Sequence, residues 1–278
     1  MAELLNYLEA MSDWQKLAWF LSCLFFCWLL ESLIPLFRFD YDKLKHDAFN
    51  IALFVMNLVL VLPVAIALGM AALWSESSQV GLLYHVDFPV WAELLLAILF
   101  LDLVAQYTVH YLLHHVKWMW RLHIVHHADT HVDASSGTRH HPGDLAFRLV
   151  AASVAIVIFG IPAIFYLVYR MLTPFFGYFT HANIRLPGNL DRLLSYVLVT
   201  PDMHKFHHHY QAPWTDSNFG NIFSFWDRMF GTLVYADTKD IRYGLDIMDD
   251  SRDLDFFYQL KAPIDPSIDT SLRPGMPG

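Results

Sequence analysis

Long apolar stretches occupy much of the first two thirds of the chain and predict its membrane helices. Three of them, over residues 14–37, 48–74 and 89–113, exceed the roughly 20 residues that a helix needs to cross a bilayer. A fourth runs over 145–179 and is interrupted at Gly160-Ile161-Pro162, where a helix would stop or kink. We interpret it as a helical hairpin that enters the membrane and returns; the alternative is one long kinked helix on the surface. The pattern predicts an all-α integral membrane protein with about four to five membrane helices.

The rest of the chain is more polar and predicts shorter elements. Residues 216–221 indicate a loop, and 223–230 a short aromatic-rich helix that could lie on the membrane surface. The stretch 261–278 is rich in Pro, Gly and Ser and predicts a flexible, loosely ordered tail. We expect one membrane-embedded domain over 1–278, with a histidine-rich core at about 90–235.

Lysine and arginine are unevenly distributed between the connecting segments. Arg38, Lys43 and Lys45 follow the first apolar stretch, and Lys117 and Arg121 follow the third, whereas the loop 75–88 contains neither. Positively charged loops favour the cytoplasmic side of a membrane. This predicts an extracytoplasmic N-terminus and 75–88 loop. Everything from about residue 114, the hairpin apart, is expected in the cytoplasm.

Composition agrees with a membrane protein and excludes two other classes. Hydrophobic residues make up 56% of the chain, against about 45–50% in soluble domains. Because the chain has no Lys/Arg run and no basic stripe, we expect no nucleic-acid partner. The two cysteines, Cys23 and Cys27, lie four residues apart in the first apolar stretch and are interpreted as core residues. Two cysteines are too few for a four-cysteine zinc module.

Histidine is the residue type that points to chemistry. The chain has 16 histidines, and half of them gather in three boxes: one His-x-x-x-His and two His-x-x-His-His. On a helix these spacings place the imidazoles on one side, so that they can converge on one metal region. The single histidines His141 and His181 lie between the second and third boxes. The box histidines are His110, His114, His123, His126, His127, His204, His207 and His208.

Two polar residues precede the first box on the same predicted helix. Gln106 and Asp102 come before His110 in steps of four, which places them on one helix face. A carboxylate at membrane depth is costly and is expected to face a protein interior. Asp102 is therefore predicted to accept a hydrogen bond from the outer nitrogen of a ligand histidine and so to orient it.

The number of clustered histidines predicts two metal ions rather than one. A structural zinc takes four ligands, and the boxes supply eight. Imidazole suits zinc, copper, iron and nickel, so ligand type leaves iron and zinc open, and purified protein could carry zinc in iron's place. Dioxygen activation at iron is a strong catalytic use of such all-nitrogen pairs. The histidines that lack a box partner or point away from a box are set aside: His46, His85, His115, His131, His140 and His209.

The order of the boxes resembles the fatty acid hydroxylase/sterol desaturase superfamily of membrane proteins. Residues 110–232 carry the resemblance, with Thr-Pro-Asp-Met-His-Lys-Phe-His-His at 200–208 and a following signature at 218–232. The segment 181–187 and the Arg-x-His-Pro element at 139–142 are also similar to motifs of the family. The resemblance implies these ligands, with His141 as a further candidate: His110, His114, His123, His126, His127, His181, His204, His207 and His208.

The resemblance also implies the reaction and its partners. It implies two iron ions on the cytoplasmic side of a membrane, expected to be a bacterial inner membrane, with dioxygen as co-substrate. The expected reaction is hydroxylation of a C–H bond of a fatty acyl, sterol-like or isoprenoid lipid. Because the chain contains no recognisable electron-transfer domain, we expect an external donor: a ferredoxin, a cytochrome b5-like protein or a reductase.

Three other functions were weighed against lipid hydroxylation. A desaturase would share every ligand, so the residues do not separate it from a hydroxylase. A zinc-dependent membrane hydrolase usually needs a carboxylate base beside its ligands, as in His-Glu-x-x-His, and no glutamate lies inside a box. A metal carrier or sensor would need a path across the membrane, whereas the boxes gather at one face.

Overall fold

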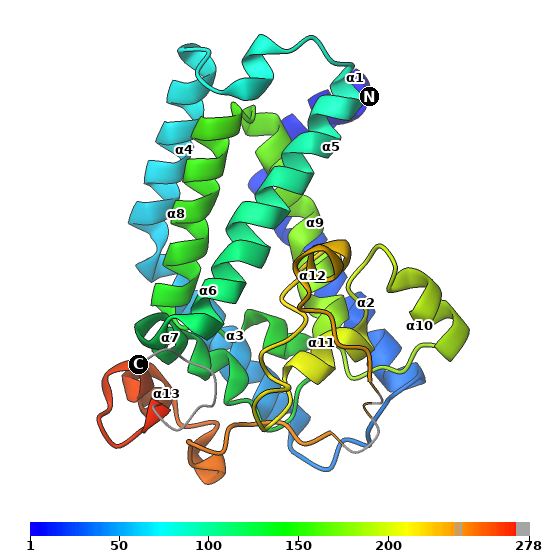
Figure 1. The fold of residues 1–278 in the computed structure, drawn as a ribbon, viewed down its shortest axis with the longest axis vertical. Coiled ribbons are helices and arrows are strands. Elements are labelled where there is room, and N and C mark those ends of the chain that lie inside the picture. Colours follow the sequence, from blue (N-terminus) through cyan, green and yellow to red (C-terminus); the bar gives the residue numbers. More distant parts are fainter. Residues whose placement is uncertain (237, 239–240, 271–278) are drawn as a thin grey trace.

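A computed structural model describes residues 1–236, 238 and 241–270. Within these ranges all regular secondary structure is helical, and two isolated β-bridges each join a single pair of residues. The long helices run along the long axis of the molecule, and most of the short helices gather at one end (Figure 1). The predicted all-α architecture is confirmed.

Three helices in the described part of the chain are long and apolar enough to cross a membrane. They are α2 (Asp13–Leu33), the continuous helix Val90–His115, and α8 (Pro142–Phe159). The middle one is built from α5 (Val90–Leu101), a π-helical segment η2 (Asp102–Thr108) and α6 (Val109–His115). The first and third predicted membrane helices are therefore confirmed to within a few residues at each end.

The second apolar stretch forms two helices, which corrects the prediction of one membrane helix over 48–74. α3 (Lys43–Leu60) and α4 (Leu62–Ser77) are separated at Val61 and bent by 56°. Pro63 lies in the first turn of α4, where its missing N–H and its ring prevent a continuous helix. If the bent pair crosses the membrane as one unit, the molecule has four candidate spans.

The fourth apolar stretch turns back on itself at Gly160, as the sequence predicts. α8 ends at Phe159, and α9 (Ala163–His181) begins directly after Pro162. Gly160 adopts a left-handed conformation with φ 66°. Gly81 packs directly against this turn, because a Cβ atom added at Gly81 would lie only 2.1 Å from the backbone nitrogen of Gly160. The two arms then diverge, because α8 packs on α4 and α9 packs on α2, while α5 contacts both.

The outer surface of the long helices is apolar. Trp14 of α2, Val59 of α3, Met70 of α4 and Ile158 of α8 each expose more than half of their surface. In water such a surface would be unusually large for a soluble protein, whereas in a bilayer it matches the hydrocarbon solvent. The exposed apolar surface supports assignment of this part of the molecule to a membrane.

Most of the short helices lie together at one end of the molecule (Figure 1). The predicted surface helix over 223–230 is present as α12 (Phe225–Phe230), and Met229 and Phe230 are exposed on it. The predicted loop over 216–221 has no regular secondary structure. The remaining short α-helices are α1 (Ala2–Glu9), α7 (Lys117–His127), α10 (Gly188–Leu194), α11 (Pro201–His207) and α13 (Phe256–Lys261). The 3-10 helices are η1 (Leu82–His85), η3 (Ala134–Thr138), η4 (Asp250–Arg252) and η5 (Ala262–Ile264).

The first part of the predicted flexible tail is packed rather than loose. The Arg121 side chain, on α7, donates hydrogen bonds to the backbone carbonyls of Ala262, Pro263, Asp265 and Ile268. These four hydrogen bonds hold residues 262–268 against α7. Residues 271–278, the rest of the predicted tail, lie outside the described residues.

The two ends of the molecule differ in what they carry. The N-terminus and the connection between α4 and α5 lie at one end, and the histidine-bearing α6, α7 and α11 lie toward the other (Figure 1). This is the relative arrangement that the charge distribution predicts. Which end faces the cytoplasm stays a prediction from that distribution.

Candidate metal centre

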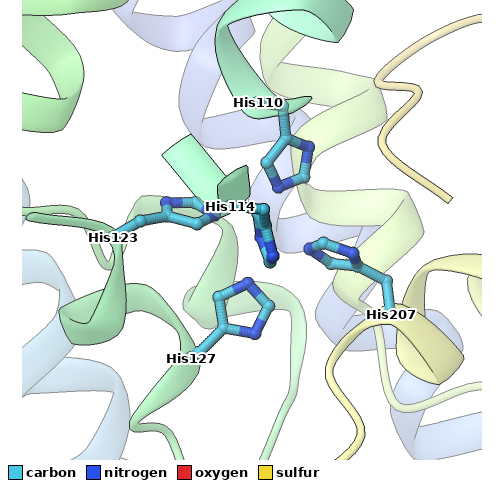
Figure 2. Close-up of side chains that lie close together, drawn as sticks. All are labelled: His110, His114, His123, His127 and His207. Carbon is cyan, nitrogen blue, oxygen red and sulfur yellow. The ribbon is translucent and has the colours of Figure 1, made fainter. Parts of the chain in front are cut away.

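All nine histidines predicted as ligands lie in two buried groups. In each group the potential ligand atoms lie within 4.8 Å of one another. Figure 2 shows the rings of the larger group arranged around a common centre. The larger group contains His110, His114, His123, His127 and His207, and the smaller one contains His126, His181, His204 and His208. We call them the five-histidine group and the four-histidine group.

Each His-x-x-His-His box contributes to both groups. On α7, His123 and His127 belong to the five-histidine group and His126 to the other. The third box, on α11 and its C-terminal cap, sends its middle histidine to the five-histidine group and the outer two to the four-histidine group. Because neighbouring positions on a helix point in different directions, one short helix can supply two adjacent sites. The two His-x-x-His-His boxes therefore place the two groups side by side.

The four-histidine group is centred on His181, the last residue of α9. Its Nε2 lies 2.9 Å from Nε2 of His204 and 3.2 Å from Nε2 of both His126 and His208. Four imidazole nitrogens this close cannot all present lone pairs to one another without repulsion. A proton or a metal ion shared between them removes that repulsion, and histidine is the commonest metal ligand in proteins.

The outer nitrogen of most of these rings is fixed by the protein. A carbonyl oxygen can only accept, so a histidine Nδ1 bonded to one must carry its proton, and Nε2 then presents its lone pair. Metal-binding histidines usually show this arrangement. The carbonyls that accept from Nδ1 are Phe219 for His110, Arg139 for His126, Gly177 for His181 and Ser217 for His207, at 2.6–3.0 Å.

Two ring nitrogens bond to carboxylates instead. The Nδ1 atom of His123 lies 2.7 Å from Oδ2 of Asp144, on α8, and Nδ1 of His114 lies 3.1 Å from Oδ1 of Asp216. Asp144 is fully buried and also accepts from Arg148 Nε at 2.9 Å. A carboxylate behind an imidazole strengthens the ring as a metal ligand. Asp144 and Asp216 come from segments distant in sequence, and sequence analysis did not identify them.

Several buried ring nitrogens make no hydrogen bond within the described part of the chain. They are Nε2 of His110, Nε2 of His123 and both nitrogens of the His127 ring. A buried polar atom without a partner costs about 1–3 kcal/mol, and such atoms are uncommon in folded proteins. A metal ion bound to the one lone pair that each of these three neutral rings presents would remove much of the cost. The donor set of the site thus fits a metal.

The box histidines are held in the neutral form that metal binding needs. Burial, the largest cause, lowers the pKa of His123 to about 4, against the opposing charge of Asp144. Burial also lowers the pKa of His126 and His127 well below the usual value, and the neighbouring histidines lower it further. At neutral pH these rings offer lone pairs rather than positive charges.

Asp102 does not orient a ligand histidine, which corrects the prediction. Its carboxylate accepts from the backbone N–H groups of Ile222 and Phe223 and from Trp226 Nε1 and the Tyr169 hydroxyl. In the described structure it makes no hydrogen bond to any of the nine histidines. The reason is that residues 102–108 form a π-helix, whose wider turn breaks the four-residue stripe that would link Asp102 to the first box.

The Asp102 carboxylate instead fixes a loop that serves the site. Residues 217–223 supply the carbonyls that hold two ligand histidines, and Asp102 anchors the end of this segment. Asp227 fixes the middle, because its carboxylate accepts from the backbone N–H groups of Phe219 and Gly220. Asn218, with φ 54°, donates to the carbonyls of Met203 and Val234. These contacts give the 218–232 signature a structural role.

His141, the further candidate ligand, lies outside both groups. Its Nδ1 accepts from the backbone N–H of Gly143 and caps the start of α8. The neighbouring His140, set aside on the sequence, is closer to the site. Its ring stacks on that of His126 with centroids 4.5 Å apart, and its Nδ1 lies 3.1 Å from Asp144 Oδ2. The prediction therefore placed the wrong member of this histidine pair near the metal centre.

The other histidines set aside lie outside both groups, as expected. His46 is buried in an acidic cluster, with Nε2 2.8 Å from Asp129 Oδ1 and Nδ1 3.1 Å from Asp133 Oδ2. These contacts give it a structural partner that its sequence context does not reveal. The four others of this set also lie outside the two groups: His85, His115, His131 and His209.

A cavity of about 320 Å³ connects the metal centre with the apolar helices. Its inner end is lined by histidines of both groups, among them His110 and His181. Its walls are formed by apolar side chains near the bend between α3 and α4, among them Leu58 and Leu62, and by one face of α9. An apolar cavity with a few polar groups is the usual form of a small-molecule site, and this one suits an alkyl chain.

Comparison with known proteins identifies the family. The model of the fatty acid hydroxylase family matches residues 94–232, half of the chain, and the chain belongs to this family. All nine clustered histidines lie inside the matched region. The family resemblance predicted from the boxes is confirmed.

Several curated proteins are similar to the chain. The ornithine lipid hydroxylase OlsE of Rhizobium tropici is 26% identical over 82% of this chain and 70% of its own length. A cholesterol 25-hydroxylase-like protein of Caenorhabditis elegans is 26% identical over 76% of this chain and 68% of its own. The alkylglycerol monooxygenase of Caenorhabditis elegans is 29% identical over 49% of the chain, and this match spans only 26% of that protein. No solved structure matches the chain.

Proposed function

We propose that the protein is a membrane-bound, dioxygen-dependent oxidoreductase that hydroxylates a C–H bond of a lipid, using two iron ions. The observation that carries the proposal is the pair of buried histidine groups at the end of an apolar cavity. The names of three relatives, a lipid hydroxylase, an alkylglycerol monooxygenase and a cholesterol hydroxylase-like protein, support it.

The two histidine groups divide the proposed metal site. The five-histidine group would hold one ion and the four-histidine group the other. When bound, the iron ions supply activation of dioxygen toward an unactivated C–H bond. The protein's part is to present neutral Nε2 atoms, which the Nδ1 bonds to carbonyls and to Asp144 and Asp216 enforce.

The cavity positions the substrate and restricts water. Apolar walls from α3, α4 and α9 would hold an alkyl chain with one carbon beside the histidines. Exclusion of water from such a site strengthens its electrostatic interactions and suppresses side reactions. The continuity of the cavity with the outer apolar helices would let a lipid reach the centre from the bilayer.

Hydroxylation also needs a reductant. One oxygen atom of dioxygen enters the C–H bond and the other leaves as water, which consumes two electrons and two protons. We propose that the electrons come from a separate donor of the ferredoxin, cytochrome b5 or reductase type. The positive residues near the histidine end favour a cytoplasmic position for the site and therefore for the donor.

Labelled dioxygen tests the proposal. Full-length protein, loaded with ferrous iron under argon, is given a lipid extract, a reductant and ¹⁸O₂, and products are analysed by mass spectrometry. We expect one labelled oxygen atom in a lipid product. A new double bond without label would instead identify a desaturase. Lipid hydrolysis without dioxygen or reductant would refute the oxidoreductase function and support a zinc hydrolase.

A further inference from the structure

One arginine in the cavity wall is unpaired within the described part of the chain. Arg170 lies near the middle of α9 and is exposed. Within the described ranges its guanidinium makes no hydrogen bond or ion pair. α9 packs against α2 and α5, which belong to candidate spans, so we expect the charge to lie at membrane depth. A charged side chain at such a depth is costly and usually marks a functional path.

The other charged groups of the cavity leave Arg170 without a counter-ion. The residues that line the cavity include two arginines and no aspartate or glutamate. Arg148, the second arginine, donates to Asp144 at 2.9 Å and to Gln106 at 2.7 Å, so its charge is balanced by a carboxylate behind the wall. The cavity therefore carries one uncompensated positive charge, and this charge favours an anionic ligand.

One face of α9 leads from this arginine to the metal centre. Its lining residues recur at intervals of three or four, which places them in a single stripe along the helix. The stripe covers twelve residues, and the eleven steps between its ends correspond to about 16 Å at the α-helical rise. Between its charged end and its histidine end the stripe is uncharged. Its members are Arg170, Thr173, Pro174, Gly177, Tyr178 and His181.

We propose that Arg170 binds the anionic group of the lipid substrate, and that the alkyl chain follows this stripe of α9 to the histidines. The inference rests on the proposed lipid oxidation, for which it names the substrate class: an amphiphile with a carboxylate or phosphate group. A guanidinium matches either anion with two parallel hydrogen bonds. Because the anion is held far along α9 from His181, the carbon that is oxidised is well removed from it.

Binding measurements test the site without relying on turnover. The full-length protein in detergent is titrated with palmitate, hexadecyl phosphate and methyl palmitate, which share one chain length and differ in charge, and complexes are counted by native mass spectrometry. We expect the wild type to bind at least one of the two anions more tightly than the ester. Arg170→Gln should weaken the binding of that anion by roughly 10- to 100-fold and leave the binding of methyl palmitate unchanged. Arg170→Lys should retain part of the preference for the anion over the ester.

A matched control and the turnover products make the outcomes distinct. Arg192→Gln, which changes an exposed arginine of α10 outside the cavity, should leave all three affinities unchanged. A preference for palmitate over the phosphate identifies a carboxylate ligand, and the reverse identifies a phosphate. If Arg170→Gln keeps the wild-type ratio of anion to ester binding, the inference is wrong.

The position of oxidation separates this inference from the proposed function. Iron-loaded wild type should oxidise a carbon distant from the anion, and Arg170→Gln should spread the product over several positions. If Arg170 binds the anion but no lipid is oxidised, the anion site stands and the proposed function fails. If lipids are oxidised with no dependence on Arg170, the function stands and the anion site fails.

Discussion

Substitution of the buried Asp144 gives a specific test of how the protein orients a histidine of the candidate metal centre. The Asp144 carboxylate accepts hydrogen bonds from His123 Nδ1 at 2.7 Å, from Arg148 Nε at 2.9 Å and from His140 Nδ1 at 3.1 Å. Asp144→Asn keeps the size of the side chain but replaces one acceptor oxygen by a donor. If the new amide faces His123, the ring must accept at Nδ1 and carry its proton on Nε2, which removes a metal ligand.

The expected magnitude follows from these contacts. Loss of a partner that orients a ligand histidine usually weakens metal binding by about 10- to 100-fold, and each factor of ten corresponds to about 1.4 kcal/mol. Arg148 also loses its carboxylate in a site where its side chain is 11% exposed. A buried ion pair that loses one partner costs about 3–5 kcal/mol of stability. Asp144→Asn should therefore bind metal weakly and unfold at lower temperature.

Asp191→Asn is the matched control, because Asp191 is also buried but accepts a hydrogen bond from the Tyr235 hydroxyl rather than from a histidine. Metal content after dialysis against graded chelator measures affinity, and thermal unfolding followed by circular dichroism measures stability. Both variants should lose stability, but only Asp144→Asn should lose metal at low chelator concentration. Equal metal retention by folded Asp144→Asn and wild type would refute the role assigned to Asp144.

Other consequences of the structure can be measured separately. His126→Ala and His207→Ala should each lose bound metal and activity, whereas His115→Ala, outside both groups, should keep its metal; loss of metal in all three would contradict the grouping. Burial lowers the pKa of His123 from 6.5 to about 4, so the unfolded chain takes up its proton first, and metal-free protein should lose stability as pH falls from about 6.5 to 4. Melting temperatures that stay constant over this range would show that the rings are not held neutral. Reporter fusions after Gln79 and after residue 261 should fall on opposite sides of the membrane, and the same location for both would overturn the proposed topology.

Hydropathy and histidine spacing were enough to predict most of the fold and eight of the nine histidines that cluster in the structure. Long apolar runs identify helices because a bilayer imposes a minimum length, and the break at Gly160 shows directly in the residue types. Eight of the nine ligand candidates were found because imidazoles spaced three or four residues apart share a helix face, and the ninth, His181, came from the resemblance to the family. The bend at Val61 was missed, because the apolar run is long enough for one membrane helix although Pro63 lies within it.

The details around the ligands depend on tertiary contacts and were not predicted. The π-helical segment 102–108 is not visible in the hydrophobic pattern, and it moved Asp102 away from the histidines. Asp144 and Asp216 reach the histidines from other parts of the fold, so no local spacing marks them. The division of the two His-x-x-His-His boxes between the groups was not predicted either, because spacing gives the side of a helix but not which neighbouring helix lies opposite.

The metal content of iron-loaded protein tests the central claim, two adjacent histidine groups that each hold one iron ion. Full-length wild type and the double variant His204→Ala/His208→Ala, which changes only the four-histidine group, are loaded with ferrous iron under argon. Elemental analysis counts the ions and Mössbauer spectroscopy reports their environments. We expect two iron ions per wild-type chain and one in the variant. One ion or none in the saturated wild type, or an unchanged count in the folded variant, would contradict a two-iron centre divided between these groups.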